Sequence, residues 1–240
     1  MGRVRTINED ACLNEPERGL WAVADGMGGH SVGDFASRMV VDKLAEIPPP
    51  SCLANFLTDA HDRLQYANRR LRSEAATRKV QRIGSTVAAL LAWDRHCACL
   101  WAGDSRIYLH RHGTLKLLTR DHTQVEQLIA RGDITPEEAI GHPAHNIVTR
   151  AVGAVDKLKL DELIVEVDHG DVFLLCSDGL SNEVSEQEMR RALAYGNCLQ
   201  ASEALVDLAL ERGGRDNISA VVVRSEDPHG GDKTLFNPEI

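Results

Sequence analysis

The stretch Leu20-Trp21-Ala22-Val23-Ala24-Asp25-Gly26-Met27-Gly28-Gly29-His30 says most about the fold of this chain. Its first five residues form an apolar run typical of a buried strand, and an acidic residue and glycines follow at once. A single Asp-Gly pair after a strand is usually a turn, because aspartate bonds its own backbone and glycine accepts a positive φ. The stretch alone therefore leaves a turn and a ligand site open.

The same arrangement of an acidic motif against an apolar run occurs four times in the chain. If the four strands share a sheet edge, four carboxylates converge there, and they cannot all stay ionised without cations among them. Separate turns would have to be invoked four times, whereas one site for hard divalent metal ions explains every motif. The other three motifs are Gly103-Asp104-Ser105-Arg106 after Cys97–Ala102, Ser177-Asp178-Gly179 after Val172–Cys176, and Arg215-Asp216-Asn217 before Ile218–Val223.

Length and composition favour one domain. The chain has 240 residues, of which 43% are hydrophobic, enough for a sizeable core. We expect this domain to cover residues 1–225 and a C-terminal tail rich in Asp, Gly and Pro to cover residues 226–240. Monomer is the default expectation.

The charge and the apolar pattern exclude some partners and locations. A formal charge of -9 argues against binding to nucleic acid or to anionic membranes, which need a cationic surface. No apolar stretch approaches the roughly 18 to 20 residues of a membrane span, and the N-terminus lacks the apolar segment of a signal peptide. The six cysteines form no zinc-type pairs, so we expect reduced thiols in a cytoplasmic protein without membrane insertion.

The periodicity of apolar residues alternates between blocks of strands and blocks of helices. Such blocks favour antiparallel sheets covered by helices over a parallel doubly wound fold. Residues 123–150 show short helical patterns and a polar stretch, so we interpret them as a mobile surface element. The predicted helices cover residues 32–47, 57–71, 185–194 and 199–212, and the predicted strands lie within residues 86–118 and at residues 163–167 and 172–176.

The order of the motifs resembles that of metal-dependent protein phosphatases of the PP2C (PPM) type, in particular bacterial stand-alone catalytic domains. The resemblance spans nearly the whole chain. It implies an α+β fold, a four-layer α-β-β-α sandwich of two antiparallel sheets flanked by helices, with the metal cleft at one edge. The matching motifs are Arg5-x-x-Asn8-Glu9-Asp10, Asp25-Gly26-Met27-Gly28-Gly29-His30, Gly84-Ser85-Thr86, Gly103-Asp104-Ser105-Arg106, Leu118-Thr119-Arg120-Asp121-His122, Ser177-Asp178-Gly179 and Asp216-Asn217.

The resemblance also implies an activity, which is hydrolysis of phosphoserine and phosphothreonine in proteins by a water that bridges two metal ions. Ligands that offer only oxygen suit Mn²⁺ or Mg²⁺. In the family, Asp25 and the Gly26 carbonyl would hold the two core ions together with Asp178 and Asp216. In bacterial members Asp104 would share a third, weaker ion with Asp178.

Glu9 and Asp10 are alternatives for a further metal ligand, and the sequence does not choose between them. Arg5 is the only early cation beside these acids, and its guanidinium can bind phosphate oxygens with two parallel hydrogen bonds. We therefore predict that Arg5 holds the substrate phosphate. Asn217 is predicted to orient the Asp216 carboxylate without binding the metal itself.

The general acid is left open. Animal relatives carry a histidine directly after Asp-Gly, where this chain has Met27. The leaving oxygen must then be protonated by a metal-bound water or by another group, for which His30, His142 and His145 are only candidates. Two further groups have no direct role in this reading: the Asp121-His122 pair is interpreted as support, and Arg150 as an anchor for the mobile element.

A catalytically silent module that binds phosphoproteins or a kinase is the alternative function. Such modules usually lose metal ligands, whereas every matched acidic position is filled here. A cysteine mechanism is disfavoured, because Cys12 is followed by Arg18 at the Cys-x5-Arg spacing but without the glycines that cradle phosphate. The expected partners are phosphorylated proteins, recognised through residues 123–147 and modified by a cognate Ser/Thr kinase. In some relatives that kinase controls a secretion apparatus.

Overall fold

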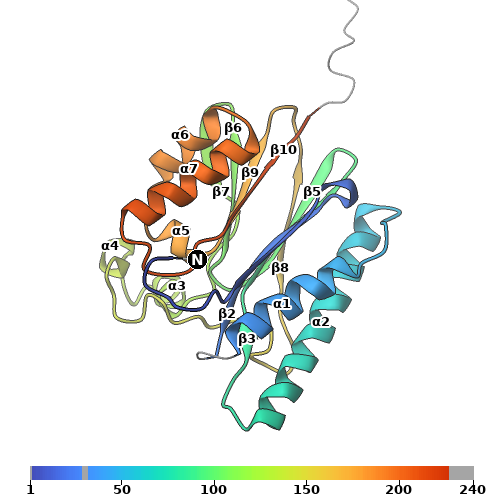
Figure 1. Ribbon diagram of the computed structural model, residues 1–240, viewed down its shortest axis with the longest axis vertical. Coiled ribbons are helices and arrows are strands. Elements are labelled where there is room, and N and C mark those ends of the chain that lie inside the picture. Colours follow the sequence, from blue (N-terminus) through green and yellow to red (C-terminus); the bar gives the residue numbers. More distant parts are fainter. Residues whose placement is uncertain (1, 29–31, 227–240) are drawn as a thin grey trace, which may run out of the picture.

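The computed structural model describes residues 2–28 and 32–226 (Figure 1). Apart from Glu226, the predicted tail lies outside the described residues, and so does His30. Two antiparallel sheets face one another at the centre, with one pair of helices on the outer side of each sheet. The predicted α+β class and the four-layer α-β-β-α sandwich are therefore confirmed.

The first sheet carries the N-terminal half of the chain. Its strands run in the order β1-β2-β4-β5-β8, and the short β3 pairs with the end of β2. The outer face of this sheet packs against α1 and α2 through side chains such as Leu20, Ala22, Val40 and Leu44, all fully buried. The elements are β1 Asp10–Glu15, β2 Leu20–Met27, α1 Gly33–Ala45, α2 Leu53–Arg78, β3 Gly84–Ser85, β4 Val87–Trp93, β5 His96–Ala102 and β8 Asp161–Glu166, with a 3₁₀ turn at Pro16–Arg18.

The second sheet has the order β10-β9-β6-β7 and lies under α6 and α7. Side chains of both sheets meet between them, including Val23 and Leu90 from the first sheet and Phe173 and Leu175 from the second. A helical turn, α5, follows β9 directly. The elements are β6 Arg106–Arg111, β7 Thr114–Leu117, β9 Val172–Cys176, α5 Asp178–Ser181, α6 Glu186–Ala194, α7 Cys198–Glu211 and β10 Ala220–Arg224.

Two short helices, α3 Gln124–Arg131 and α4 Pro136–Ala139, fill the connection between β7 and β8. The side chains of Thr123 and Thr135 accept hydrogen bonds from the first turn of each helix, which satisfies amide groups that helix starts leave free. The chain then returns to the body, where Gln124 N–H donates to the Ile147 carbonyl at 2.8 Å. This return segment is thus tied to the start of α3.

Several boundaries differ from the sequence prediction. The strand β1 was not predicted at all, and α2 is longer than the expected 57–71 because its polar ends carry no apolar period. Strand β2 runs on through its acidic motif, since Gly26 and Met27 pair with β3. The four strands next to the acidic motifs belong to two sheets and not to one. The acidic motifs meet because both sheets end at the same edge of the sandwich.

No helix within residues 2–28 and 32–226 has the length and apolar composition that a membrane span needs.

Candidate metal centre

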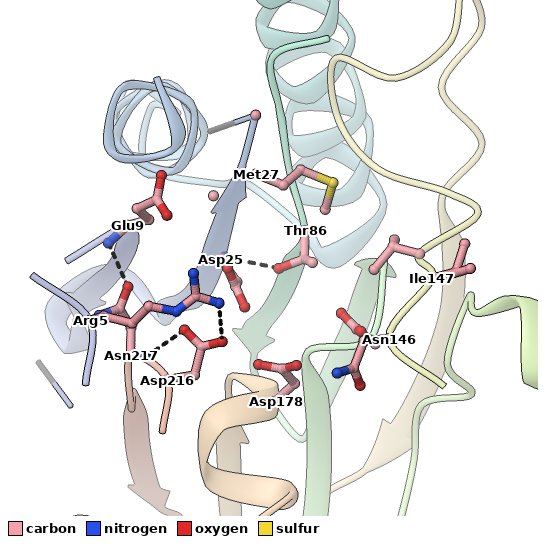
Figure 2. A pocket seen from close by; sticks show the side chains of 14 residues that line it. Arg5, Glu9, Asp25, Met27, Thr86, Asn146, Ile147, Asp178, Asp216 and Asn217 are labelled. Atoms are coloured by element: carbon pink, nitrogen blue, oxygen red, sulfur yellow. Dashed lines mark hydrogen bonds and ion pairs between the residues drawn. The ribbon is translucent and has the colours of Figure 1, made fainter. Parts of the chain in front are cut away.

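The four acidic motifs meet around a cavity of about 530 Å³ at one edge of the sandwich (Figure 2). The first sheet supplies Asp25 from β2 and Asp104 after β5, and the second supplies Asp178 at the start of α5 and Asp216 before β10. Of the predicted metal ligands together with Arg5 and Asn217, only Asp10 does not line the cavity. The lining residues are Arg5, Glu9, Asp25, Gly26, Met27, Gly28, Thr86, Asp104, Asn146, Ile147, Val148, Asp178, Asp216 and Asn217.

Asp25 is held in place by Thr86. The Asp25 N–H donates to Thr86 Oγ1 at 2.9 Å, and the Thr86 N–H donates to the Asp25 carbonyl at 2.8 Å. Gly26 follows where no side chain fits, because a Cβ there would lie 1.9 Å from the Gly33 carbonyl oxygen. Close approach of two backbones therefore requires the glycine that follows the first acidic residue.

Asp104 follows a glycine for two reasons. Gly103 has a φ of +114°, and a Cβ would lie 2.6 Å from the Thr86 side chain. The hydroxyl of the next residue, Ser105, lies 2.7 Å from Thr86 Oγ1. Thr86 thus joins the Asp25 strand to the Asp104 turn, a role that no motif in the sequence had indicated.

Arg5 lies at the mouth of the cavity and points toward Asp216 (Figure 2). Its Nη2 donates to Asp216 Oδ2 at 2.8 Å, and this hydrogen bond raises the pKa of the Arg5 guanidinium. The preceding chain is pinned by Arg3, whose N–H donates to the Gly214 carbonyl at 2.8 Å. Arg5 is half exposed, so its fork is accessible from solvent.

Asn217 does more than the sequence predicted. Its N–H donates to Asp216 Oδ1 at 2.8 Å, in keeping with support for that carboxylate. Its side-chain amide holds the N-terminal segment, because Oδ1 accepts from the Glu9 N–H at 2.8 Å and Nδ2 donates to the Ile7 carbonyl at 3.0 Å. Sequence spacing gave no sign of this contact between residues more than 200 positions apart.

Glu9 and Asp10 take different places. Glu9 lies at the cavity rim with its carboxylate directed toward α1, close to Gly33. Asp10 is buried beneath the site, where Oδ2 accepts a hydrogen bond from Ser177 Oγ at 2.8 Å. Glu9 Oε1 and Asp10 Oδ1 are both buried without a hydrogen-bond partner.

The carboxylates make one another hard to ionise. Burial and then the charges of Asp10 and Asp178 raise the pKa of Asp25 well above its usual range. Burial, followed by the Asp178 charge, raises the pKa of Asp104 to about 7. Burial and then Asp216 also raise the pKa of Asp178. Such a group of anions lacks the positive charge that would balance it.

The chemical type of the available donor atoms fits a divalent metal ion. As the side chains stand, no three carboxylate, histidine or cysteine groups of the described residues are arranged to hold an ion. The available donors are nonetheless all oxygens, which Mg²⁺ and Mn²⁺ prefer. The buried, unpaired oxygens of Glu9 and Asp10 and the mutual repulsion of the aspartates are what bound cations would relieve.

The two described histidine candidates for the general acid, His142 and His145, lie in different places relative to the cavity. His145 lines a smaller hollow next to the main cavity, together with Asp104 and Asn146. His142 is turned toward its own backbone, where Nδ1 accepts from the Ala144 N–H at 3.1 Å, and it lines none of the hollows around the site. Sequence reasoning missed Asn146, Ile147 and Val148, which form a wall of the cavity after a long excursion of the chain.

Comparison with known proteins gives the class. A sequence model of the family described as protein phosphatase 2C matches residues 3–209. A curated relative, the serine/threonine phosphatase Stp of Listeria welshimeri, is 35% identical over 231 residues, which are 92% of each chain. The serine/threonine protein phosphatase PstP of Mycobacterium tuberculosis is 35% identical over 92% of this chain, but the match spans only 43% of PstP.

Solved structures agree with this class. PppA, described as a key regulatory component of T6SS in Pseudomonas aeruginosa, superposes with a TM-score of 0.87 and 45% identity, covering 93% of each chain. The catalytic domain of PstP in complex with two manganese ions has a TM-score of 0.81 and 34% identity, covering 94% of this chain and 95% of that one. The chain belongs to the protein phosphatase 2C family. The predicted PP2C (PPM) type is confirmed.

Proposed function

We propose that the chain hydrolyses phosphoserine and phosphothreonine in proteins at the cavity that joins the two sheets. The observation that carries this proposal is the convergence of Asp25, Asp104, Asp178 and Asp216 with one accessible guanidinium, that of Arg5. The names of the family and of its curated members support it.

Two ions of Mn²⁺ or Mg²⁺ are proposed as the core cofactor. Asp25, the Gly26 carbonyl, Asp178 and Asp216 would hold them, and Asp104 with Asp178 would hold a third ion. The two manganese ions in the PstP structure support the first part of this proposal. When bound, such ions lower the pKa of water at the site and offset the negative charge of the phosphate.

The residues of the chain supply position and charge. Arg5 presents two parallel N–H groups to the phosphate, since its single bond from Nη2 to Asp216 leaves other N–H groups of the guanidinium available. Thr86 keeps Asp25 aligned with the strand, and Asn217 keeps residues 7–9 against the second sheet. Such fixed groups stabilise a transition state without the cost of rearrangement during the reaction.

The test is release of phosphate from a phosphothreonine peptide by the purified chain, with chelator, Mg²⁺ and Mn²⁺ in parallel. Metal-dependent turnover that Asp178→Asn abolishes supports the proposal. A wild-type chain that binds Mn²⁺ but releases no phosphate contradicts it and supports the alternative, a silent binding module. The filled acidic positions favour the enzyme over that alternative.

The proposed partners are phosphoproteins that a cognate Ser/Thr kinase modifies. The likeness to PppA, named as a regulator of T6SS, supports a role beside a secretion system. The six cysteines are all unpaired, which supports a reducing compartment such as the cytoplasm. Phosphoproteomic comparison of cells with and without the active chain tests the partners, because true substrates gain phosphate when Asp178→Asn replaces the wild type.

A further inference from the structure

His122 lies outside the set of proposed ligands, yet it holds both backbone polar groups of Gly103. The His122 N–H donates to the Gly103 carbonyl at 2.8 Å, and the Gly103 N–H donates to His122 Nδ1 at 3.1 Å. His122 is 8% exposed, so neither bond has water as a ready substitute. One residue thus fixes the backbone immediately before Asp104.

The contacts of the imidazole define its tautomer. Because Nδ1 accepts from Gly103, the proton of the neutral ring must sit on Nε2, which lies 3.1 Å from Asp161 Oδ2 and donates to it. The ring also stacks on Trp101, with the centroids 6.3 Å apart and the planes at 7°. Burial lowers the pKa of His122, which favours the neutral form. The ring therefore has one orientation and one proton position.

His122 also holds the segment that returns from α3 and α4. Its carbonyl accepts from Thr149 N at 2.7 Å and from Thr149 Oγ1 at 3.0 Å. The Asp161 carboxylate accepts the hydrogen bond from His122 Nε2 through Oδ2. Its other oxygen pairs with Arg150. Ile147 and Val148, just before these residues, line the cavity. His122 thus bonds to Gly103, next to Asp104, and to Thr149, next to the cavity-lining residues 147 and 148.

The polar groups of Gly103 itself are bonded by His122, and the turn is held besides by the contact between the Ser105 hydroxyl and Thr86 Oγ1. Its other side rests on Thr86, which the missing Cβ of Gly103 allows to approach. A left-handed glycine has wide conformational freedom when its polar groups are released. Loss of the His122 side chain would therefore leave a buried N–H unpaired and let the Asp104 carboxylate turn.

We propose that His122 is a positioning residue, which fixes the Asp104 carboxylate for a divalent ion and joins the Gly103 turn to residues 147–150. It does not line the cavity and so does not touch substrate. The proposal rests on the proposed function only where Asp104 is taken as a metal ligand. The claim that His122 holds the Gly103 backbone does not depend on the proposed function, because it rests on the two hydrogen bonds between these residues.

The experiment compares His122→Ala, His122→Asn and His122→Gln. The Asn side chain places an oxygen where Nδ1 stood, whereas Gln places its polar group near the position of Nε2. Amide hydrogen exchange over residues 101–106 reports the Gly103 bond, and calorimetric titration of the metal-free chain reports Mn²⁺ affinity. We expect faster exchange and about 10-fold weaker binding of Mn²⁺ in Ala and Gln, with Asn close to wild type.

Asn68→Ala is the matched control. Asn68 is buried, accepts from the Gly153 N–H and donates to the Val155 carbonyl, but does not contact the Gly103 turn. A comparable loss of unfolding free energy with unchanged exchange at 101–106 and unchanged Mn²⁺ affinity separates positioning from general destabilisation. The Asn–Gln pair gives the same comparison if His122→Ala does not fold.

Equal behaviour of His122→Asn and His122→Gln in exchange and in Mn²⁺ affinity would overturn the proposal. So would wild-type Mn²⁺ affinity in His122→Gln. If the wild-type chain binds no Mn²⁺ at all, the proposed function fails, while the exchange of Gly103 still decides whether His122 holds the turn. The two failures are therefore distinct.

Discussion

Arg5 and Asp216 form an ion pair across the mouth of the cavity, with 2.8 Å between Nη2 and Oδ2. The two residues lie 211 positions apart in the chain, and each is a proposed part of the site. In the free protein, Asp216 therefore takes up one of the N–H groups that a phosphate would use. The proposed phosphate would therefore share the Arg5 guanidinium with Asp216.

The first prediction concerns Arg5. We expect Arg5→Ala to lower kcat/KM for a phosphopeptide by roughly 100-fold, because one charged, two-pronged donor to the transition state is lost. Arg5→Lys keeps the charge without the fork and should recover only part of this loss. Arg3→Ala is the control, since Arg3 binds the body through its backbone N–H. Full activity of Arg5→Ala in a steady-state phosphate assay would exclude Arg5 from phosphate binding.

The second prediction concerns the charge inside the cavity. Burial and neighbouring carboxylates raise the pKa of Asp25, so its ionised form opposes folding near neutral pH when no cation is bound. We expect Asp25→Asn to raise the free energy of unfolding in chelator by about 1–2 kcal/mol in urea denaturation. Mn²⁺ should then stabilise the wild type but not the variant.

Asp59→Asn, a change at the α2 surface, is the control and should alter neither value. A metal-free Asp25→Asn chain that unfolds more easily than the wild type would show that the aspartate charge is already balanced.

The third prediction concerns the apolar side of the cavity. Ile147 is 49% exposed beside the proposed metal ligands, and Met27 lines the same cavity. We expect Ile147→Ser to lower kcat/KM about 5-fold for a peptide with valine next to phosphothreonine, and little for one with serine there. Ile140→Ser is the control, because Ile140 is 83% exposed and does not line this cavity. Equal losses on both peptides would argue against an apolar contact.

The fourth prediction concerns the thiols. Burial raises the pKa of Cys97, Cys99 and Cys176 to about 12 each, so at pH 8 only about one thiolate in 10⁴ is present even before access is considered. We expect these three to stay unmodified by iodoacetamide in the folded chain, as read by peptide mass spectrometry. Cys12, which is exposed, and Cys52 and Cys198, which are partly exposed, should react first. Early labelling of Cys176 would indicate opening of the second sheet.

The local part of the fold could be predicted from the sequence because apolar periodicity is local. The pattern at 32–47 and the run at Leu20–Ala24 correspond to α1 and β2, and the family resemblance supplied the sandwich. Boundaries were less accurate where tertiary pairing extends an element. Met27 belongs to β2 only because Gly84 lies opposite, which no window around residue 27 can show.

The site was predictable in its acidic residues and less so in what holds them. Asp25, Asp104, Asp178 and Asp216 could be found because each follows or precedes an apolar run. The roles of Thr86, Asn217 and His122 depend on contacts with residues between 19 and 210 positions away. The sequence contains these residues in its motifs but does not show what they touch.

The hydrogen bonds from Asn217 to the Glu9 and Ile7 backbone join the two ends of the domain, which determines when the site can form during protein synthesis. The cavity needs Arg5 from the N-terminal segment and Asp216 from just before β10, so the site cannot form until residue 216 has been synthesised and has left the ribosome. Residues 5–216 must therefore all be outside the exit tunnel before the cavity is complete. Premature termination anywhere before residue 216 would thus leave the cavity without Asp216 and not merely alter its shape.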